Sequence, residues 1–219
     1  MLKTVLYFVI SLTLWGYAMS ETKNIGLPPP ESMGKISVEE AISRRRSCRN
    51  FSDKKISLQE ISQLLWACQG ITDSVRHFRA APSAGATFPF ETYLIAGAVD
   101  GIEPGAYRYN YRTHSLELIK KSDIRRELAN ACLSQSFIID APATIILAAL
   151  YNRTTNRYGE RGYRYVAIEA GHIGQNLHLQ CESIGLGTVM IGAFQDDKVK
   201  SLLEIEEEPL YIMPVGKPE

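Results

Sequence analysis

The sequence lacks an excess of charge of either sign. Lys and Arg together number 24, and so do Asp and Glu, so the formal net charge of the 219 residues is zero at pH 7. A chain without net charge is a poor candidate for bulk binding to nucleic acid or to an anionic membrane. Any anion site must therefore be a local cluster of basic residues, and no nucleic acid partner is expected.

Cysteine is scarce, and none of the four cysteines forms a C-x-x-C pair. This spacing excludes the usual zinc and redox-dithiol motifs, so no metal site is expected. Cys68, Cys132 and Cys181 fall within helical patterns, which favours buried free thiols. Disulfides remain an alternative if the protein is exported.

Long hydrophobic runs are also lacking, apart from one near the N-terminus. Lys3 precedes an apolar stretch from Val5 to Ala18, and the stretch ends in Ala18-Met19-Ser20. A basic start, a short apolar centre and a small-residue exit are typical of a secretory signal peptide, and a membrane span needs about 20 apolar residues. We expect a signal peptide over 1–20 and a periplasmic or extracellular protein without a membrane span. The alternative is an uncleaved N-terminal membrane anchor.

Residues 21–35 contain three consecutive prolines and no periodic apolar pattern, which predicts a linker before one domain over 36–219. In that domain, capping boxes at Ser37 and Ser57 and a cap at Ser122 each open a helix. Helices mix with strands and a hairpin without regular βαβ alternation, which indicates an α+β fold with a mainly antiparallel central sheet flanked by helices. The expected helices are 37–46, 57–70, 124–132, 163–184 and 196–203, and the expected strands are 92–96, the hairpin 107–118, 143–151, 188–191 and 210–215.

The densest polar cluster is Arg44-Arg45-Arg46-Ser47-Cys48-Arg49. Arginine offers paired donors that match phosphate oxygens, and the serine adds a neutral donor. The cluster therefore favours a phosphate site. The alternative is a solvated basic helix end whose positive charges interact favourably with the helix dipole.

Two glycine-containing loops are candidate sites for a flat ring. The loop Pro82-Ser83-Ala84-Gly85-Ala86-Thr87 precedes an expected strand and exposes backbone groups that could bind the edge of a heterocycle. Gly192, beside Ala193, would let backbone lie flat against a ring. Taken singly, each loop is a weak signal, because most such loops are only turns.

Together these segments resemble one family. The stretch from Arg45 to Phe51 resembles the nitroreductase opening Arg-x-Ser-x-basic-x-Phe, and Pro82 to Ala86 resembles the flavin-edge loop of that superfamily. The run from Tyr163 to Phe194 and the ending 209–218 resemble the branch that includes the azoline-oxidising (SagB-type) dehydrogenases of peptide natural products. The motifs cover residues 37–218 in the expected order.

The resemblance implies a nitroreductase-like fold and an FMN-containing homodimer with the flavin near the subunit interface. By position, the ribityl phosphate is held by Arg45, Ser47 and Arg49, together with Arg46, and Lys217 is a substitute for a later basic contact. Pro82, Ser83, Ala84 and Gly85 line the pyrimidine side of the ring, and Gly192 and Ala193 lie near its redox-active edge. No side chain is identified as a catalytic proton donor, and Tyr158 and Arg161 are candidates for lining a substrate pocket.

The small residues Ala167, Ala170, Gly171 and Gly174 share one stripe of the long helix, which places it at the domain centre or at a subunit interface. The implied activity is reduction of nitro- or quinone-like acceptors with NAD(P)H or another donor. One alternative is a SagB-type dehydrogenase that oxidises a small-molecule or peptide-derived substrate, which export would favour because NAD(P)H is not expected to be abundant outside the cytoplasm. Another alternative is a flavin-binding protein without turnover.

Overall fold

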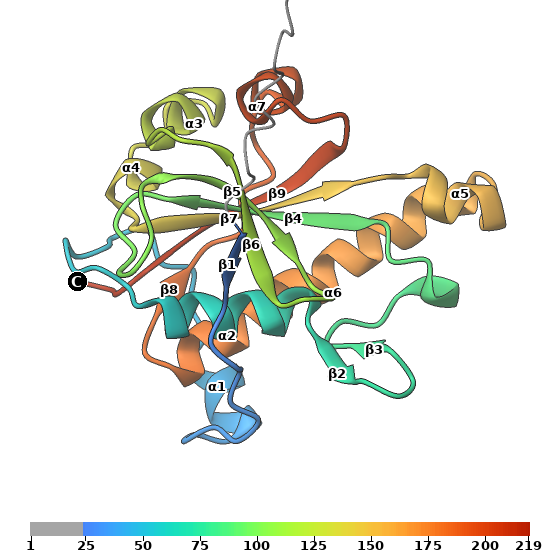
Figure 1. Cartoon of the computed structure of the whole chain (residues 1–219), viewed down its shortest axis with the longest axis horizontal. Helices are drawn as coiled ribbons and strands as arrows, with labels where there is room; N and C mark the ends of the chain where they lie inside the picture. The colour runs from blue at the N-terminus through green and yellow to red at the C-terminus, as the bar shows by residue number, and fades with distance from the viewer. Residues whose placement is uncertain (1–23) are drawn as a thin grey trace, which may run out of the picture.

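The computed structural model describes residues 24–219, so the expected signal peptide lies outside the described residues. A seven-stranded sheet with the order β1-β6-β5-β4-β7-β9-β8 forms the centre of the fold (Figure 1). Neighbouring strands of this sheet pair antiparallel, which confirms the expected α+β class. The strands are β1 (Asn24–Gly26), β4 (Phe90–Ala96), β5 (Gly105–Asn110), β6 (Ser115–Lys120), β7 (Ala143–Ala149), β8 (Gly187–Thr188) and β9 (Glu208–Gly216), and β2 (Ile71–Asp73) and β3 (Phe78–Arg79) form a separate two-stranded sheet.

Helices cover both faces of the sheet (Figure 1). The long helix α6 lies with α1 and α2 on one face, whereas α3, α4 and α7 lie on the other, and α5 extends beyond the end of the sheet. The bounds are α1 (Val38–Arg44), α2 (Leu58–Gln69), α3 (Arg125–Ala131), α4 (Phe137–Asp140), α5 (Asn152–Tyr158), α6 (Arg161–Ser183) and α7 (Asp196–Leu203), with a short 3-10 helix η1 (Ala84–Ala86).

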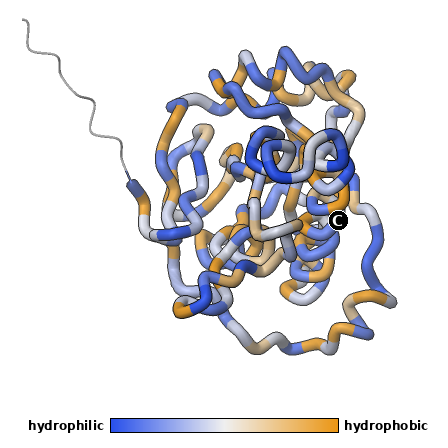
Figure 2. Tube along the Cα trace, turned by 90° about the vertical axis from the view of Figure 1, so that its right-hand side faces the viewer, coloured by the Kyte–Doolittle hydropathy of each residue, from blue (hydrophilic) through white to orange (hydrophobic). Residues whose placement is uncertain are grey.

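The central strand β7 belongs to both hydrophobic cores. All seven of its residues are buried. Ile145 and Leu147 join the core beneath α2 and α6, whereas Ile146 and Ala148 join the core beneath α3, α4 and α7. The nearly continuous apolar run in the sequence therefore reflects burial on two faces. Figure 2 shows how hydrophilic and hydrophobic residues alternate in short stretches along the rest of the chain.

Capping side chains determine where several helices begin. Ser57 and Glu60 form the expected capping box at α2, and the helix ends before Gly70. Ser37 accepts a hydrogen bond from the Glu40 backbone N–H at α1, but the Glu40 carboxylate pairs with Arg44 instead of closing a box. The expected cap at Ser122 is wrong. The carboxylate of Asp123, not the hydroxyl of Ser122, accepts a hydrogen bond from the Arg125 backbone N–H at the start of α3.

Folded structure begins earlier than the sequence predicts. Residues 24–26, within the expected linker, form β1 and pair with β6. Farther along the same segment, the Glu31 N–H donates to the Gln63 side chain of α2 at 2.8 Å. No local pattern signals these contacts, since the partners lie far away in the sequence. The structure also contains α5 where a polar connection was expected, and β8 is shorter than expected.

Among the described residues, no helix is both long and apolar enough to cross a membrane.

Candidate functional site

The four arginines of the basic cluster have different surroundings. Arg44 pairs with Glu40 at 2.6 Å across one turn of α1. Arg46 folds back on the helix end, where its Nη1 donates to the Ser43 and Arg45 carbonyl oxygens at 3.0 and 2.8 Å. Within residues 24–219, Arg45 and Arg49 have no ion pair of 4.0 Å or less. The helix-end alternative therefore describes Arg44 and Arg46, and Arg45 and Arg49 are the cations available to an anion.

The backbone around Ser47 is fixed against the end of β8. Ser47 forms a parallel bridge with Thr188, and the Cys48 N–H donates to the Thr188 carbonyl oxygen at 2.9 Å. A Cβ at Gly187 would lie 2.6 Å from the Cys48 Cβ, so this close approach requires glycine. The Thr188 hydroxyl is buried and has no hydrogen-bond partner in the described part of the chain. An orphaned hydroxyl beside Ser47 indicates a site that a polar ligand or a water can complete.

Lys217 lies close to this segment, but its ammonium group lies beside a carboxylate of α2. Its carbonyl oxygen accepts from the Ser52 backbone N–H at 2.9 Å, which holds the C-terminal residues against the segment after Arg49. Its ammonium lies 3.8 Å from a Glu60 carboxylate oxygen at the start of α2. The structure therefore places Lys217 near the expected phosphate site, with a competing carboxylate.

Gly192 and Ala193 lie on the same side of the molecule as the basic segment. Residues between α3 and α4, and α4 itself, contact both. Gln135 donates to the Ala193 carbonyl oxygen at 3.3 Å. The Arg49 guanidinium lies 6.0 Å from the centre of the Phe137 ring on α4. A Cβ placed at Gly192 would have no neighbour within 4 Å, so open space adjoins this exposed backbone.

The loop Pro82–Gly85 has an unusual backbone. Gly85, Ala86 and Phe88 have φ values of 58°, 54° and 44°. These values lie in the left-handed region, which residues other than glycine rarely adopt. The Ser83 hydroxyl oxygen accepts from the Phe88 N–H at 2.9 Å, and Ala84 begins η1. Non-glycine residues in such conformations concentrate at ligand sites, because the surrounding structure must maintain them.

Helix α5 packs directly against this loop. Arg157 donates to the Gly85 carbonyl oxygen at 3.0 Å. A Cβ at Gly85 would collide with the Tyr158 hydroxyl and the Arg157 guanidinium. Tyr158, a candidate pocket residue, is therefore at the loop.

The basic segment and the Pro82–Gly85 loop are not brought together within one chain. The loop contacts α5, whereas Ser47 contacts β8, and Figure 1 shows α5 and β8 at opposite sides of the molecule. Helix α6 runs between the two groups. Its Glu169 lies near Ser83, and its His178 is near enough to Arg45 for their charges to interact. A rise of about 1.5 Å per residue separates Glu169 and His178 by roughly 13 Å along the helix.

Glu169 is a candidate site residue that the sequence motifs did not identify. It is 3% exposed, and its Oε1 has no hydrogen-bond partner among the described residues. Burial raises the Glu169 pKa from 4.5 to about 7, against the opposing effects of the Ser83 hydroxyl and the Arg79 guanidinium. A substantial fraction of this carboxyl is therefore protonated at neutral pH. A single acidic residue on the inward stripe of α6 was the sequence signal that could have identified it.

His178 does not add positive charge to the basic segment at neutral pH. Burial, and to a smaller extent the charge of Arg45, lowers the His178 pKa to about 4. The imidazole is therefore neutral in the folded protein, and the candidate anion site depends on guanidinium groups.

The small-residue stripe of α6 divides between two environments. Gly174 faces inward, where an added Cβ would lie 3.0 Å from the Met190 sulfur. Gly171 is exposed, and an added Cβ there would meet nothing within 4 Å. On the exposed side, Tyr163 and Ile168 are 51% and 49% exposed. The helix thus combines a packed inner face with an outer face that carries large apolar side chains.

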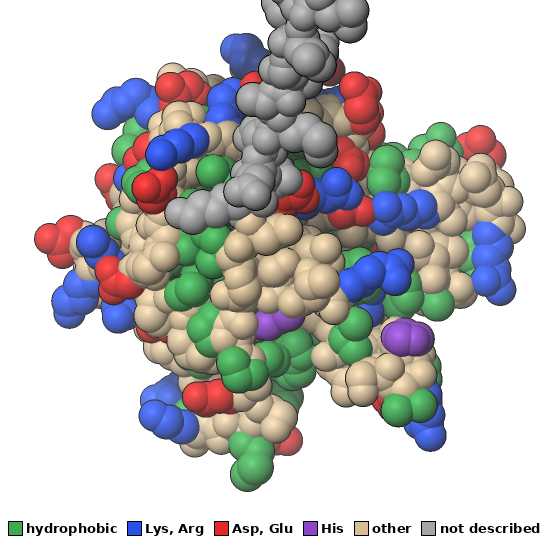
Figure 3. Space-filling model, in the orientation of Figure 1, with side chains coloured by type: hydrophobic (Ala, Val, Ile, Leu, Met, Phe, Trp, Pro, Cys, Tyr) green, Lys and Arg blue, Asp and Glu red, His purple; other side chains and the backbone are tan. Residues whose placement is uncertain are grey.

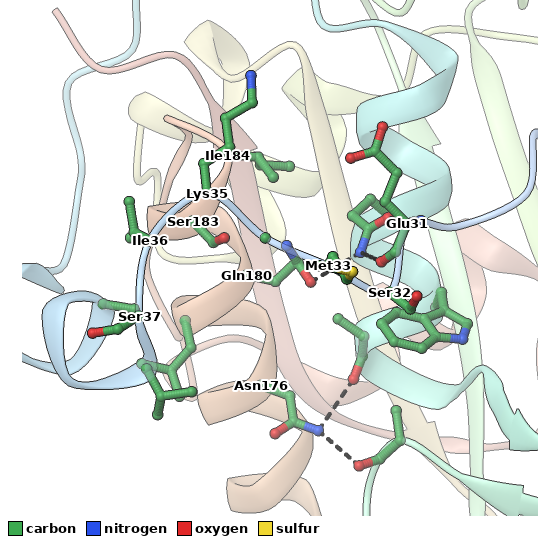
Figure 4. Close-up of a pocket in the computed structure, with 18 of the residues that line it drawn as sticks. Glu31, Ser32, Met33, Lys35, Ile36, Ser37, Asn176, Gln180, Ser183 and Ile184 are labelled. Atoms are coloured by element: carbon green, nitrogen blue, oxygen red, sulfur yellow. Dashed lines mark hydrogen bonds between the residues drawn. The ribbon is translucent and has the colours of Figure 1, made fainter.

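A cavity of about 590 Å³ lies away from every predicted site residue. It is bounded by the segment 31–38 and by helices α2 and α6 (Figure 4). At its floor, Asn176 donates to the carbonyl oxygens of Ala67 and Ala80, both at 3.1 Å. Asn176 is thus a structural link between elements.

Comparisons with known proteins identify the family. The pattern of the nitroreductase family matches residues 42–217. A protein of Methanocaldococcus jannaschii that is named as a nitroreductase is 45% identical over 199 residues, which cover 91% of this chain and 98% of that protein. The crystal structure of a nitroreductase from Ralstonia eutropha has a TM-score of 0.79 at 28% identity, covering 90% of each chain.

More distant relatives are named for microcin B17 processing and for the trifolitoxin operon. The microcin B17-processing protein McbC of Escherichia coli is 25% identical over 95% of this chain and 81% of its own length. The trifolitoxin operon protein TfxC of Rhizobium leguminosarum is 28% identical over 86% of this chain but only 57% of its own length. The E. coli microcin synthetase McbBCD complex shares the fold, with a TM-score of 0.72 at 24% identity, covering 97% of this chain and 85% of that one. The family match and the 45% identity over nearly the whole chain show that this protein belongs to the nitroreductase family, with relatives in the branch that its motifs resemble.

Proposed function

We propose that the protein is an FMN-dependent oxidoreductase whose flavin sites each combine residues from two copies of the chain. The observation that carries this proposal is the separation of the Arg45–Arg49 segment from the Pro82–Gly85 loop, at opposite sides of one chain. The exposed apolar face of α6 lies along the surface between them. A two-fold dimer built on such a face uses the same patch twice, so the segment of one copy can meet the loop of the other.

The residues present fit the phosphate of FMN. Arg45 and Arg49 have no carboxylate partner in the described chain, Ser47 is exposed between them, and Thr188 beside Ser47 has an unused hydroxyl. Arginine forks and hydroxyl donors together are suited to a phosphate group with two negative charges. Lys217 is a weaker candidate because Glu60 already lies close to its ammonium.

The ring would be held mainly by backbone. Gly192 and Ala193 have open space beside them, and the left-handed loop at Gly85 exposes peptide groups that a heterocycle edge can bind. When bound, FMN supplies the electron-transfer chemistry, and the chain binds it, orients it and controls its surroundings. Glu169, which is buried near Ser83, has a pKa of about 7 and can therefore hold or release a proton near neutral pH.

The first candidate reaction is reduction of nitro- or quinone-like acceptors with NAD(P)H or another donor. The family match supports it, as does a 23% identical relative from Staphylococcus haemolyticus named an NADPH-dependent oxidoreductase. The second candidate is oxidation of a peptide-derived substrate. It is supported by the relatives McbC and TfxC, whose names refer to microcin B17 processing and to the trifolitoxin operon.

Arg45→Ala tests the flavin site. The change removes charge-assisted hydrogen bonds worth about 1.5–3 kcal/mol, so we expect FMN affinity to fall by roughly 10- to 150-fold. The measurement is the FMN content of purified protein by absorbance, followed by titration of the stripped protein. The matched control is Arg44→Ala, because Arg44 belongs to the same cluster but pairs with Glu40. Unchanged FMN affinity in folded Arg45→Ala protein would refute the phosphate assignment.

A further inference from the structure

A polar cavity of about 510 Å³ lies immediately beside the Pro82–Gly85 loop. Residues 86–88, which continue that loop, form one wall, and the rest of the lining comes from β3, the start of β4, the β5–β6 hairpin and the start of α5. Figure 3 shows Lys and Arg side chains gathered on this face between the sheet and α5. The volume lies within the ~300–1,000 Å³ range of small-molecule sites.

The lining of this cavity carries more positive than negative charge. Four arginines face two glutamates, Glu91 and Glu117. Glu91 is already occupied, since its two oxygens pair with Arg108 at 2.9 Å and with Arg153 at 2.6 Å. The remaining arginines are Arg79 and Arg112, neither of which has a carboxylate within 4.0 Å in the described part of the chain.

Arg79 is held rigidly in a partly buried position. Its guanidinium lies 3.3 Å from the centre of the Tyr111 ring and 4.2 Å from that of Phe88. One nitrogen donates to the neutral Gln69 side chain at 2.9 Å, and the carboxyl groups that act on Arg79, Glu91 and Glu169, do so from beyond ion-pair distance. A guanidinium fixed between two rings binds a carboxylate at little cost in conformational entropy.

Arg112 adds a second cation at the same ring. Its guanidinium lies 5.1 Å from the centre of Tyr111, and Arg79 and Arg112 are close enough to repel one another. Two like charges next to each other cost free energy, and an anion bound between them would remove that cost. The arrangement therefore favours a negatively charged group in the cavity.

We propose that this cavity binds a carboxylate group of the substrate through Arg79 and Arg112, while the reacting part of the substrate extends toward the adjacent Pro82–Gly85 loop. This inference rests on the proposed oxidoreductase function, and it defines the substrate class as acidic. The carboxylate is that of a small organic acid or of the C-terminus of a short peptide, since the same fork recognises both.

Kinetics with a matched pair of acceptors test the inference. With 4-nitrobenzoate and 4-nitrobenzamide at low ionic strength, we expect kcat/KM of the holoenzyme to favour the carboxylate. This preference should fall about tenfold in Arg79→Gln and in Arg112→Gln, because each change removes a charge-assisted hydrogen bond. The control Arg126→Gln, an exposed arginine of α3 outside the cavity, should keep the preference.

Calorimetry separates this site from the proposed reaction and distinguishes the two carboxylate sources. Benzoate and glycylphenylalanine are titrated into the full-length protein beside benzamide and glycylphenylalanine amide. Binding of benzoate alone indicates a small organic acid, binding of the dipeptide alone indicates a peptide terminus, and either supports the carboxylate site even if no acceptor is turned over. Acid and amide that bind equally, or acid binding that is as tight in folded Arg112→Gln protein as in the unmodified protein, would overturn the inference. Arg112→Gln keeps the test decisive if Arg79→Gln does not fold.

Discussion

Glu169 shows how a single buried group can link stability to pH. Its pKa rises on folding from 4.5 to about 7, chiefly because burial disfavours the ionised carboxylate. Between these values the unfolded chain releases the proton and the folded chain keeps it. The free energy of unfolding contributed by this group is therefore fully present below pH 4.5 and is lost as pH rises toward 7. His178, with its folded pKa of about 4, acts in the opposite direction, since its stabilising effect is lost as pH falls below 6.5.

We therefore predict that Glu169→Gln removes one source of destabilisation at neutral pH. The free energy of unfolding of the variant, relative to the unmodified protein, should rise between pH 4.5 and pH 7. Urea denaturation at both pH values measures this difference, and the contribution of His178 cancels because both proteins contain it. Glu127→Gln on the exposed surface of α3 is the control and should show no such trend. A difference independent of pH would mean that folding does not change the pKa of Glu169.

Helix α6 is the element with the clearest division of roles. Gly174 packs closely, since an added Cβ would lie 3.0 Å from Met190 and 3.3 Å from Tyr211. The exposed Gly171 meets no neighbour in this chain, although Ile168 nearby on the helix is 49% exposed. The small residues that share one stripe in the sequence therefore serve internal packing at Gly174 and face outward at Gly171.

We predict opposite consequences for leucine at the two glycines. Gly174→Leu should lower the free energy of unfolding by about 1–3 kcal/mol or more, because the core has no room for the side chain. Gly171→Leu should leave the stability of the isolated fold nearly unchanged but should weaken self-association, because it alters the exposed face. Urea denaturation and light scattering measure the two effects. The assignment of Gly174 to internal packing would be wrong if Gly174→Leu were as stable as the unmodified protein. The assignment of Gly171 to the association surface would be wrong if Gly171→Leu associated as tightly as the unmodified protein.

At the scale of the whole molecule, the proposal that each flavin site combines two chains depends on where the basic segment and the Pro82–Gly85 loop lie. The loop contacts α5 and the basic segment contacts β8. These two elements lie at opposite sides of the molecule (Figure 1). If the sites are shared between copies, two defective chains can complement one another. A chain that lacks the phosphate arginines can still provide its loop, and a chain with a damaged loop can still provide its arginines.

We predict that mixed dimers of Arg45→Ala and Gly85→Leu chains recover FMN binding. Each variant alone should bind little FMN, since Arg45→Ala weakens the phosphate site and Gly85→Leu collides with Tyr158. After refolding the two together, each mixed dimer should contain one intact site and one doubly defective site. FMN bound per chain is measured by absorbance, with separately refolded chains combined afterwards as the control. A site formed within one chain would show no recovery, because every chain in the mixture carries a defect.

The sequence by itself determined the features that depend on neighbouring residues. The capping box of Ser57 and Glu60 and the buried run of β7 were predicted because hydrogen bonding within one turn and burial on two faces leave local patterns. The order of the motifs also determined the family. The signal peptide over 1–20 stays a prediction.

Tertiary structure alone decided which groups are available for chemistry. Arg44 and Arg45 are adjacent and chemically identical, yet only the first has a carboxylate partner in the described structure, because a helical turn places Glu40 beside it. The pKa of Glu169 rises to about 7 because residues distant in sequence exclude water from its carboxyl group. The cavity around Arg79 draws its walls from four separate segments of the chain. Burial and through-space charge depend on distances between segments that the linear sequence does not contain, and the fold must form before these properties exist.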